Sequence, residues 1–238
     1  MNLNVNKGGI MSYIKNLFNS VIPVIKYMVY SYIIIFISFI FCSLMGYTDI
    51  NNYLINIAPY IIIIFHIVYA IILLKNNKFL CKKTKPLIPF ILLGISYSCF
   101  FNMIIIKLKP NDPVSMNILL LLLSGVILGP LVEEIIFRYL LTNKISKFNS
   151  KILTIILSSL IFSLMHNGII NNIYTFILGL ILNTIYLKNK NLLYPLIVHA
   201  SANLATIFLT GYNEYILTLS FILLIISMLI VKRDYLLK

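Results

Sequence analysis

The chain has 238 residues, of which 61% are hydrophobic and 11% charged, and its mean hydropathy is +0.99. This composition excludes an ordinary soluble domain and indicates a membrane protein with several spans. The formal net charge of +13 would suit a nucleic-acid-binding protein. The basic residues lie mainly in short segments between apolar runs, which is typical of a topology signal, so no nucleic-acid partner is expected.

The apolar runs predict the fold. A hydrocarbon core about 30 Å thick requires about 20 apolar residues per helix. The sequence therefore predicts an all-α transmembrane bundle of about eight spans, at 27–47, 53–74, 87–106, 117–141, 152–167, 169–187, 192–209 and 214–231. Residues 1–26 are expected to precede it as an N-terminal segment, in which 11–25 (MSYIKNLFNSVIPVI) predicts an amphipathic helix at the inner interface with a break at Pro23. Residues 27–238 are expected to form one polytopic domain.

The basic residues orient this bundle. With the N-terminus in the cytoplasm, 16 of the 19 Lys and Arg residues fall on the cytoplasmic side, whereas Lys107 and Lys109 fall outside. The opposite orientation would contradict the positive-inside rule, so both termini are expected in the cytoplasm, where the basic side would attract anionic lipids. The Ile-, Asn- and Lys-rich composition favours a bacterial source and hence a multi-pass protein of the plasma membrane. The 16 residues are Lys7, Lys15, Lys26, Lys75, Lys78, Lys82, Lys83, Lys85, Lys144, Lys147, Lys151, Lys188, Lys190, Lys232, Arg233 and Lys238.

Few ionisable residues lie within the spans, and each is a functional candidate because its burial in hydrocarbon is costly. A helical rise of about 1.5 Å per residue places Glu133, His166, His199 and Asn203 about 13 to 22 Å from the nearest cytoplasmic lysines. These residues come from three spans and share the middle of the membrane, so we expect them to form one site. His66 has a similar depth but no evident partner, and we interpret it as a structural histidine.

Spacing within the fourth span assigns different surroundings to its two acids. Glu134 and Arg138 are four residues apart, with the acid first, which favours an ion pair. Glu133 is rotated by about 100° from Glu134, so its carboxylate is expected to remain available. Pro130 lies just before the acids and predicts a kink.

Two chemistries fit the predicted set. In the first, Glu133 acts as general base on a water molecule, His166 shares the proton, and His199 with Asn203 stabilises an oxyanion. In the second, Glu133, His166 and His199 bind zinc and leave a fourth position for water. We favour the first, because Asn203 lies one helical turn from His199 and no outer acceptors for zinc-bound histidines are identified. The cofactor is therefore either zinc or none.

Three short motifs resemble those of a known family. EEIIFR at 133–138, FSLMH at 162–166 and HASAN at 199–203 resemble the motifs of the CPBP intramembrane proteases, the CAAX-protease and bacteriocin-processing or Abi family. The resemblance covers about 117–208 and implies an intramembrane endopeptidase. It implies that Glu133 and His166 activate water, that His199 and Asn203 stabilise the oxyanion, and that Glu134 and Arg138 support the site. Tyr139 replaces the small residue expected after the arginine.

The expected partners are a hydrophobic or lipid-associated peptide substrate and membrane lipids. Peptide processing, pheromone maturation or self-immunity to a bacteriocin would each suit a bacterial member. One alternative function is a proton-coupled transporter in which Glu133 and the histidines form a proton relay. The sequence lacks the two related halves typical of transporters. A second alternative is a non-catalytic immunity or scaffold protein with the same fold.

Overall fold

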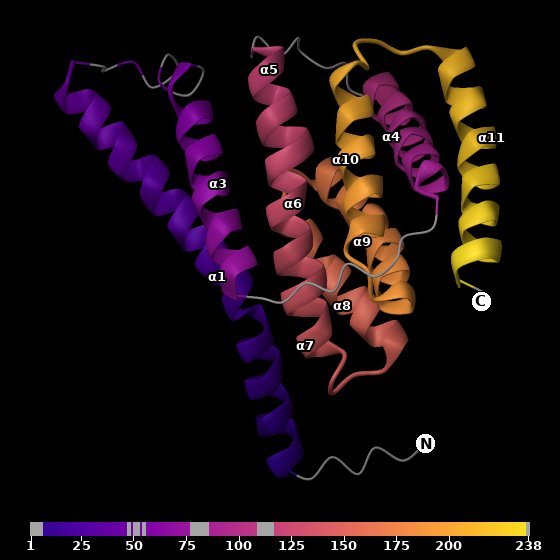
Figure 1. Cartoon of the computed structure of the whole chain (residues 1–238), viewed down its shortest axis with the longest axis horizontal. Helices are drawn as coiled ribbons and strands as arrows, with labels where there is room; N and C mark the ends of the chain where they lie inside the picture. The colour runs from indigo at the N-terminus through magenta and orange to yellow at the C-terminus, as the bar shows by residue number, and fades with distance from the viewer. Residues whose placement is uncertain are drawn as a thin grey trace.

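The computed structural model describes residues 7–46, 49, 53, 56–76, 86–108 and 117–236. Within these ranges the regular structure is entirely helical and contains no strand, which confirms the predicted all-α class (Figure 1). The elements are α1 (Lys7–Leu44), α3 (Ala58–Asn76), α4 (Ile88–Leu108), α5 (Ile118–Leu121), α6 (Gly129–Glu134), α7 (Asn143–Ile145), α8 (Lys151–Ser163), α9 (Ile169–Asn189), α10 (Leu193–Ile207) and α11 (Glu214–Val231), with π-helical segments η1 (Leu122–Leu128), η2 (Ile135–Thr142) and η3 (Lys232–Leu236).

Six helices among the described residues are long and apolar enough to cross a membrane. Two further apolar helices, α8 and α10, have 13 and 15 residues and are shorter than a full span. The six long helices and these two shorter ones make eight helical segments, which agrees roughly with the eight predicted spans. Residues 77–85, with four of the 16 basic residues assigned to the cytoplasmic side, lie outside the described residues, as do Lys109 and residues 1–6.

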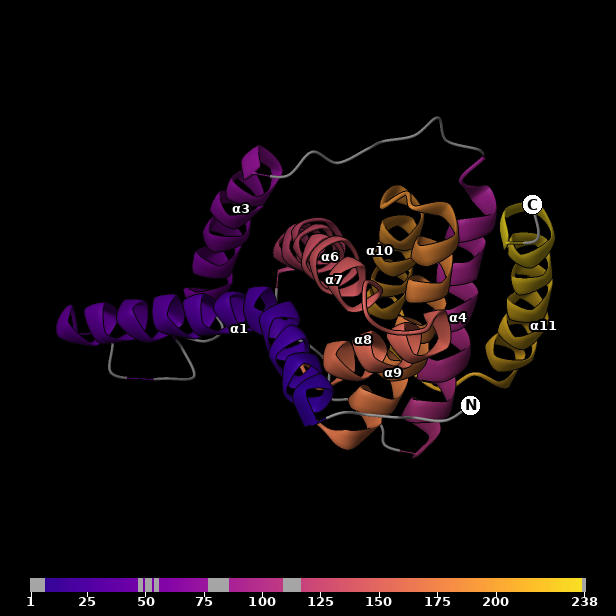
Figure 2. The same cartoon turned by 90° about the horizontal axis from the view of Figure 1, so that it is seen from below.

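The structure of the N-terminal helix differs from the prediction of a break at Pro23. No break occurs at Pro23, because α1 continues through this residue from Lys7 to Leu44. Figure 2 shows that α1 is bent along its length, as expected when proline removes one backbone hydrogen bond and its ring crowds the preceding turn. Ser20 and Val24 are buried, so part of the segment predicted to lie at the interface packs against the rest of the protein.

The helix that carries the two glutamates contains two π-helical segments. The elements α5, η1, α6, η2 and α7 follow one another without interruption and form one rod (Figure 1). The expected disturbance at Pro130 takes the form of a π-helical segment on each side of α6. Because a π turn contains more residues than an α turn, η1 and η2 change which side chains share a face of the rod. Such segments often occur at functional sites.

Two buried apolar clusters hold the helices together. One joins α4, α9, α10 and α11, and the other joins α1, α3, the α6–α7 part of the rod and α8. Glycines permit two close helix contacts. A Cβ atom on Gly94 would lie 2.3 Å from the carbonyl oxygen of Val198, and one on Gly179 would lie 3.1 Å from the Cβ of Ser159. These contacts fix α10 against α4 and α9 against α8.

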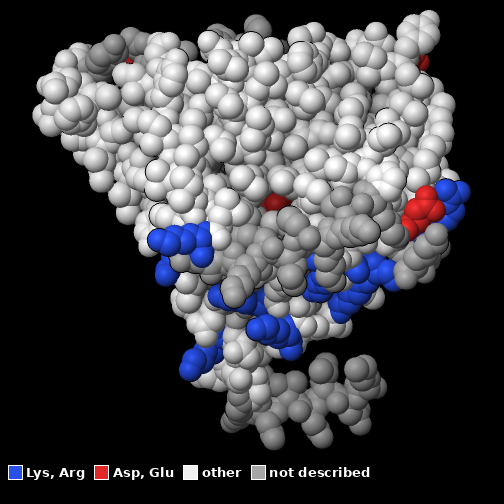
Figure 3. Space-filling model, in the orientation of Figure 1, with Lys and Arg blue, Asp and Glu red and all other residues white. Residues whose placement is uncertain are grey.

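The described charges are unevenly distributed. Figure 3 shows basic side chains along the lower edge of the molecule, where α7 and the first part of α1 lie, below a broad uncharged face. A small acidic area is visible near the middle of that face. This distribution suits a helical bundle embedded in a bilayer with its basic edge in water. That the basic edge faces the cytoplasm remains a prediction.

Candidate active site

The centre of the site is a buried group of three side chains, two from the rod and one from α10. Glu134 Oε2 lies 3.0 Å from Arg138 Nε, and both side chains are fully buried. Glu134 Oε1 accepts a hydrogen bond of 2.9 Å from Nδ1 of His199 on α10. Glu134 is therefore neutralised along its own rod and also holds the imidazole of a second helix. The predicted ion pair is present, but its additional contact with His199 was not predicted.

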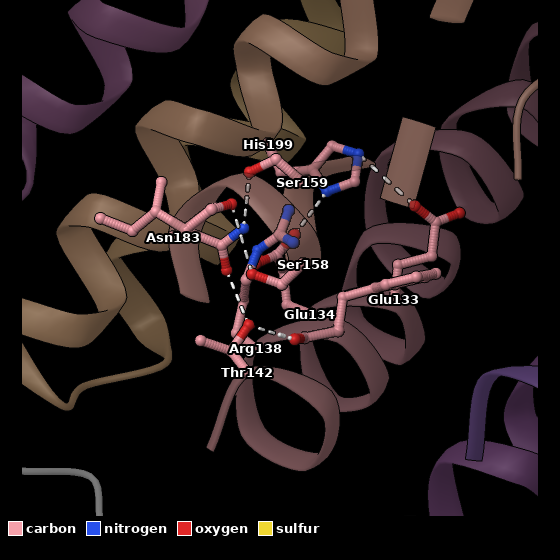
Figure 4. Close-up of polar contacts among 10 residues, drawn as sticks. Glu133, Glu134, Arg138, Thr142, Ser158, Ser159, Asn183 and His199 are labelled. Atoms are coloured by element: carbon pink, nitrogen blue, oxygen red, sulfur yellow. Dashed lines mark hydrogen bonds and ion pairs between the residues drawn. The ribbon is translucent and has the colours of Figure 1, made fainter. Parts of the chain in front are cut away.

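Glu133 has different surroundings from Glu134. Its carboxylate approaches the other nitrogen of the same imidazole, with Oε2 at 3.8 Å from His199 Nε2 (Figure 4). The side chain of Glu133 is 24% exposed, whereas that of Glu134 is 0% exposed. One carboxylate thus fixes the histidine from inside the protein, and its neighbour reaches open space.

His166 lies just beyond the C-terminal end of α8, in the turn that leads to α9. Its backbone N–H donates to the carbonyl oxygen of Ser163 at 3.0 Å, and its Nδ1 lies 3.1 Å from the carbonyl oxygen of Phe162. Because a carbonyl can only accept, Nδ1 carries the hydrogen in that contact, which leaves Nε2 as an acceptor. Gly168 supplies the positive φ of 89° that closes the turn.

A cavity of about 240 Å³ connects Glu133 with His166. Both residues line it, so the cavity brings two of the predicted catalytic side chains together. The opposite wall comes from α1. The lining residues are Tyr27, Met28, Ser31, Tyr32, Glu133, Phe137, Met165 and His166.

Phe162 lies between the polar groups and separates them. Its ring makes edge contacts with the rings of His166 and His199, at centroid distances of 5.0 and 5.8 Å. The guanidinium carbon of Arg138 lies 4.5 Å from the same ring centroid, in reach of a cation–π interaction. Phe162 is fully buried. It therefore contributes packing, and its ring contacts both histidines.

Asn203 does not line this cavity. Its side-chain nitrogen donates to the backbone carbonyl of Gly125 in η1 at 2.8 Å. A carbonyl of a π-helical segment can lack its usual intrahelical partner, and Asn203 supplies a hydrogen bond to such a group. One of its two amide hydrogens remains for another acceptor.

A buried polar chain supports the rod one turn beyond Arg138. Thr142 donates to Asn183 Oδ1 at 2.7 Å, and Asn183 donates to Ser159 Oγ at 2.9 Å (Figure 4). Thr142 also lies 2.7 Å from the carbonyl oxygen of Phe137, five residues back, so its single hydroxyl hydrogen is shared between Asn183 and this backbone group of η2. This chain ties the rod to α9 and α8 and so positions the two glutamates relative to His166. Sequence reasoning missed these residues, although polar side chains within apolar helices were the available signal.

The predicted zinc ligands do not gather into a metal site. Across the described ranges, no three His, Cys, Asp or Glu side chains come close enough to hold a metal ion. Nδ1 of His199 is engaged by Glu134, and His166 contacts the carbonyl of Phe162. Glu133, His166 and His199 as arranged here therefore do not fit a three-ligand zinc centre, and no metal-dependent step is derived from them.

His66 has a partner that sequence reasoning did not find. Its Nε2 lies 2.9 Å from the hydroxyl oxygen of Tyr27, on the wall of the cavity that contains Glu133. Tyr27 was not among the predicted site residues, because nothing in its local sequence distinguishes it from the other tyrosines of α1. The depth estimate would have separated the two residues, because Tyr27 directly follows Lys26 whereas His66 is nine residues from Lys75.

The fold and this site define a polytopic helical membrane protein with ionisable side chains gathered inside the bundle beside a cavity. Residues 115–205 match the model of a family described as Rce1-like, type II CAAX prenyl endopeptidase Rce1-like. The match confirms the resemblance to the CPBP and CAAX proteases over this part of the chain, and it supports intramembrane peptidase activity in general. No match was found among the curated proteins or the solved structures. The matched residues include the whole predicted site, whereas α1 and α3 lie outside them.

Proposed function

We propose that the protein is an intramembrane endopeptidase that hydrolyses a peptide bond of a hydrophobic, membrane-associated peptide. The observation that carries this proposal is the contrast between the two adjacent glutamates. Glu134 is fully buried and paired with Arg138, whereas Glu133 is partly exposed and shares a cavity with His166. A protein that needed only a structural ion pair would not require the second carboxylate.

In the proposed reaction a water molecule binds between the carboxylate of Glu133 and the ring of His166. Glu133 accepts a proton from this water as the water oxygen attacks the carbonyl carbon of the peptide bond. His166 Nε2 accepts a second hydrogen bond from the same water and orients it. The carbon–nitrogen bond of the intermediate then breaks, and the proton held by Glu133 passes to the departing amine. The products are a new carboxyl group and a new amino group.

His199 and Asn203 are proposed to stabilise the negative charge on the carbonyl oxygen. Because Nδ1 of His199 donates to Glu134, His199 can donate to the oxyanion through Nε2, the ring atom that faces Glu133, when the ring carries a hydrogen on both nitrogens as the imidazolium. Asn203 can act through its second amide hydrogen. Donors held in place before the reaction stabilise the oxyanion without a cost of reorganisation at that moment.

The proposed substrates are peptides or protein ends in the membrane of a bacterium. The cavity lies within an apolar bundle, so a segment that partitions into lipid can reach it without crossing water. Peptide processing and self-immunity to a bacteriocin are the two biological roles that suit such a substrate.

The proposal is tested by reconstituting the full chain in phosphatidylcholine and phosphatidylglycerol liposomes with a library of internally quenched hydrophobic peptides. Wild-type protein is expected to cleave a subset of the library, and mass spectrometry should locate one cleaved bond in each peptide. Glu133→Gln protein is expected to cleave none of them while retaining its unfolding temperature. Equal cleavage by both proteins would show that Glu133 is not the base.

A further inference from the structure

Tyr27 on α1 and His66 on α3 form a hydrogen-bonded pair at the edge of the cavity that contains Glu133 and His166. The hydroxyl oxygen of Tyr27 lies 2.9 Å from Nε2 of His66. The two rings are nearly parallel, with an interplanar angle of 18° and centroids 6.1 Å apart. The phenol of Tyr27 also stacks on Phe65, with centroids 5.9 Å apart. Tyr27 is therefore held by aromatic contacts as well as by its hydrogen bond.

Tyr27 lines two cavities. One is the cavity of about 240 Å³ with Glu133 and His166, and the other, of about 180 Å³, is lined mostly by apolar side chains of α1 and α3 and by His66. Tyr27 and Ser31 line both. Glu133 and Tyr27 line the same cavity, and His66 contacts the hydroxyl of Tyr27. The pair thus belongs to the surroundings of the proposed base although it lies outside the region matched by the family model.

Few side chains of this cavity can donate a hydrogen bond to a substrate. Glu133 as a carboxylate and His166 Nε2 are acceptors. The hydroxyl of Ser31 already donates to the carbonyl oxygen of Met28 at 2.8 Å. The side chain of Tyr32 is 64% exposed. Tyr27 lines this cavity, and its hydroxyl is held in place by the contact with His66.

The surroundings of His66 indicate the direction of the hydrogen bond. His66 is 8% exposed, and its Nδ1 has no hydrogen-bond partner within the described part of the chain. A buried N–H without a partner is rarer in proteins than a buried acceptor without one. The hydrogen of the neutral ring is therefore best placed on Nε2, from which it donates to the oxygen of Tyr27. The hydroxyl hydrogen of Tyr27 is then free to point into the cavity.

We infer that Tyr27 is a further catalytic residue that donates a hydrogen bond to the carbonyl oxygen of the substrate peptide, and that His66 is its positioning residue. This inference rests on the proposed peptidase function and adds a donor on the wall opposite the rod. The donor becomes most important when negative charge develops on that oxygen, so it contributes mainly to kcat. The helices α1 and α3 would then complete the active site and not only anchor the protein.

The test uses the full chain in liposomes and the best-cleaved internally quenched peptide of the library described above. Tyr27→Phe removes one hydroxyl and preserves the aromatic packing. It is expected to lower kcat by about 100-fold and to change KM by less than about threefold, because the lost contact strengthens in the transition state. Tyr30→Phe is the matched control, since Tyr30 is on the same helix, is 45% exposed and lines neither cavity. Its kcat is expected to stay at the wild-type value.

Two variants of His66 test the positioning role. His66→Gln retains an N–H near the position of Nε2 and is expected to keep most of the activity, whereas His66→Leu is expected to lower kcat about tenfold. Unfolding temperatures in detergent show whether each protein is folded. If wild-type protein cleaves peptides and Glu133→Gln does not, but Tyr27→Phe matches wild type or changes only KM, this inference is wrong and the proposed function stands. If wild-type protein cleaves no peptide, the proposed function fails and the inference fails with it.

Discussion

Nδ1 of His199 lies 2.9 Å from the carboxylate of Glu134, while Nε2 of the same ring lies 3.8 Å from the carboxylate of Glu133. Two residues adjacent in the sequence therefore contact the two nitrogens of one imidazole on another helix. The carboxylate of Glu134 holds the ring from a fully buried position, whereas the side chain of Glu133 also lines the cavity with His166. This relationship separates the structural glutamate from the proposed catalytic one.

Removing Arg138 should destabilise the protein more than removing any exposed charge. Arg138→Met leaves Glu134 fully buried without its ion-pair partner, and a loss of about 3–5 kcal/mol in the free energy of unfolding is expected. The double variant Glu134→Gln with Arg138→Met should lose less than the sum of the two single changes, because no buried charge is left. Chemical unfolding in mixed micelles measures these differences.

The exposed ion pair between Arg233 and Asp234, at 2.8 Å, offers the control. Arg233→Met should leave the unfolding transition nearly unchanged, because water screens this pair. Equal losses for Arg138→Met and Arg233→Met would contradict the role assigned to the buried pair.

The close contact of α4 and α10 should not tolerate a larger residue at Gly94. A Cβ atom there would lie 2.3 Å from the carbonyl oxygen of Val198, so Gly94→Ala must separate the helices and should cost about 1–3 kcal/mol. Gly125→Ala meets no atom within 4 Å and should be neutral or slightly stabilising. Thermal unfolding of the two variants provides the comparison, and a neutral Gly94→Ala would mean that α4 and α10 are farther apart.

His166 should matter for the reaction and little for the fold. It lies in a turn and is only partly buried, so His166→Ala should retain the wild-type unfolding temperature. Loss of its action on the water should lower kcat by about 10²–10⁴-fold. Asn167→Ala changes the adjacent exposed residue of the same turn and should cleave the library at the wild-type rate. A His166→Ala protein that cleaves normally would remove this histidine from the mechanism.

Treatment with a chelator distinguishes the two chemistries that the sequence left open. Because the described side chains do not form a three-ligand metal site, we expect wild-type protein incubated with 1,10-phenanthroline to retain its cleavage rate. The measurement is peptide cleavage before and after removal of the chelator, with metal content determined on the same samples. Activity that is lost and then restored by zinc would require Glu133, His166 and His199 to rearrange into a metal site.

The depth and spacing of a few polar residues predicted which side chains would lie near one another in the bundle. Hydrophobic lengths were sufficient to predict the helical bundle, and the order of charges was sufficient to predict the pairing of Glu134 with Arg138. The contact of Glu134 with His199 could not be predicted, because it depends on the angular positions that η1 and η2 impose on the rod. A straight α-helix would have been the ordinary assumption for this segment.

The N-terminal helices were harder to interpret for a different reason. Tyr27 and His66 are separated by 39 residues in the sequence and meet only when α1 and α3 pack together. Neither residue belongs to a motif, and a single histidine on an apolar helix usually has a structural role. Similarly, the helix break expected at Pro23 did not occur, because the packing of α1 against the neighbouring helices outweighs one missing hydrogen bond.

The most direct test of the account compares Glu133→Gln with Glu134→Gln, two isosteric changes at adjacent positions. Both proteins are assayed for peptide cleavage and unfolding in the same liposomes and detergent. The account predicts that Glu133→Gln unfolds like wild type and has no measurable kcat, whereas Glu134→Gln unfolds at a lower temperature and still cleaves the peptide below that temperature. A stable Glu134→Gln protein without activity, beside a Glu133→Gln protein that cleaves normally, would contradict it.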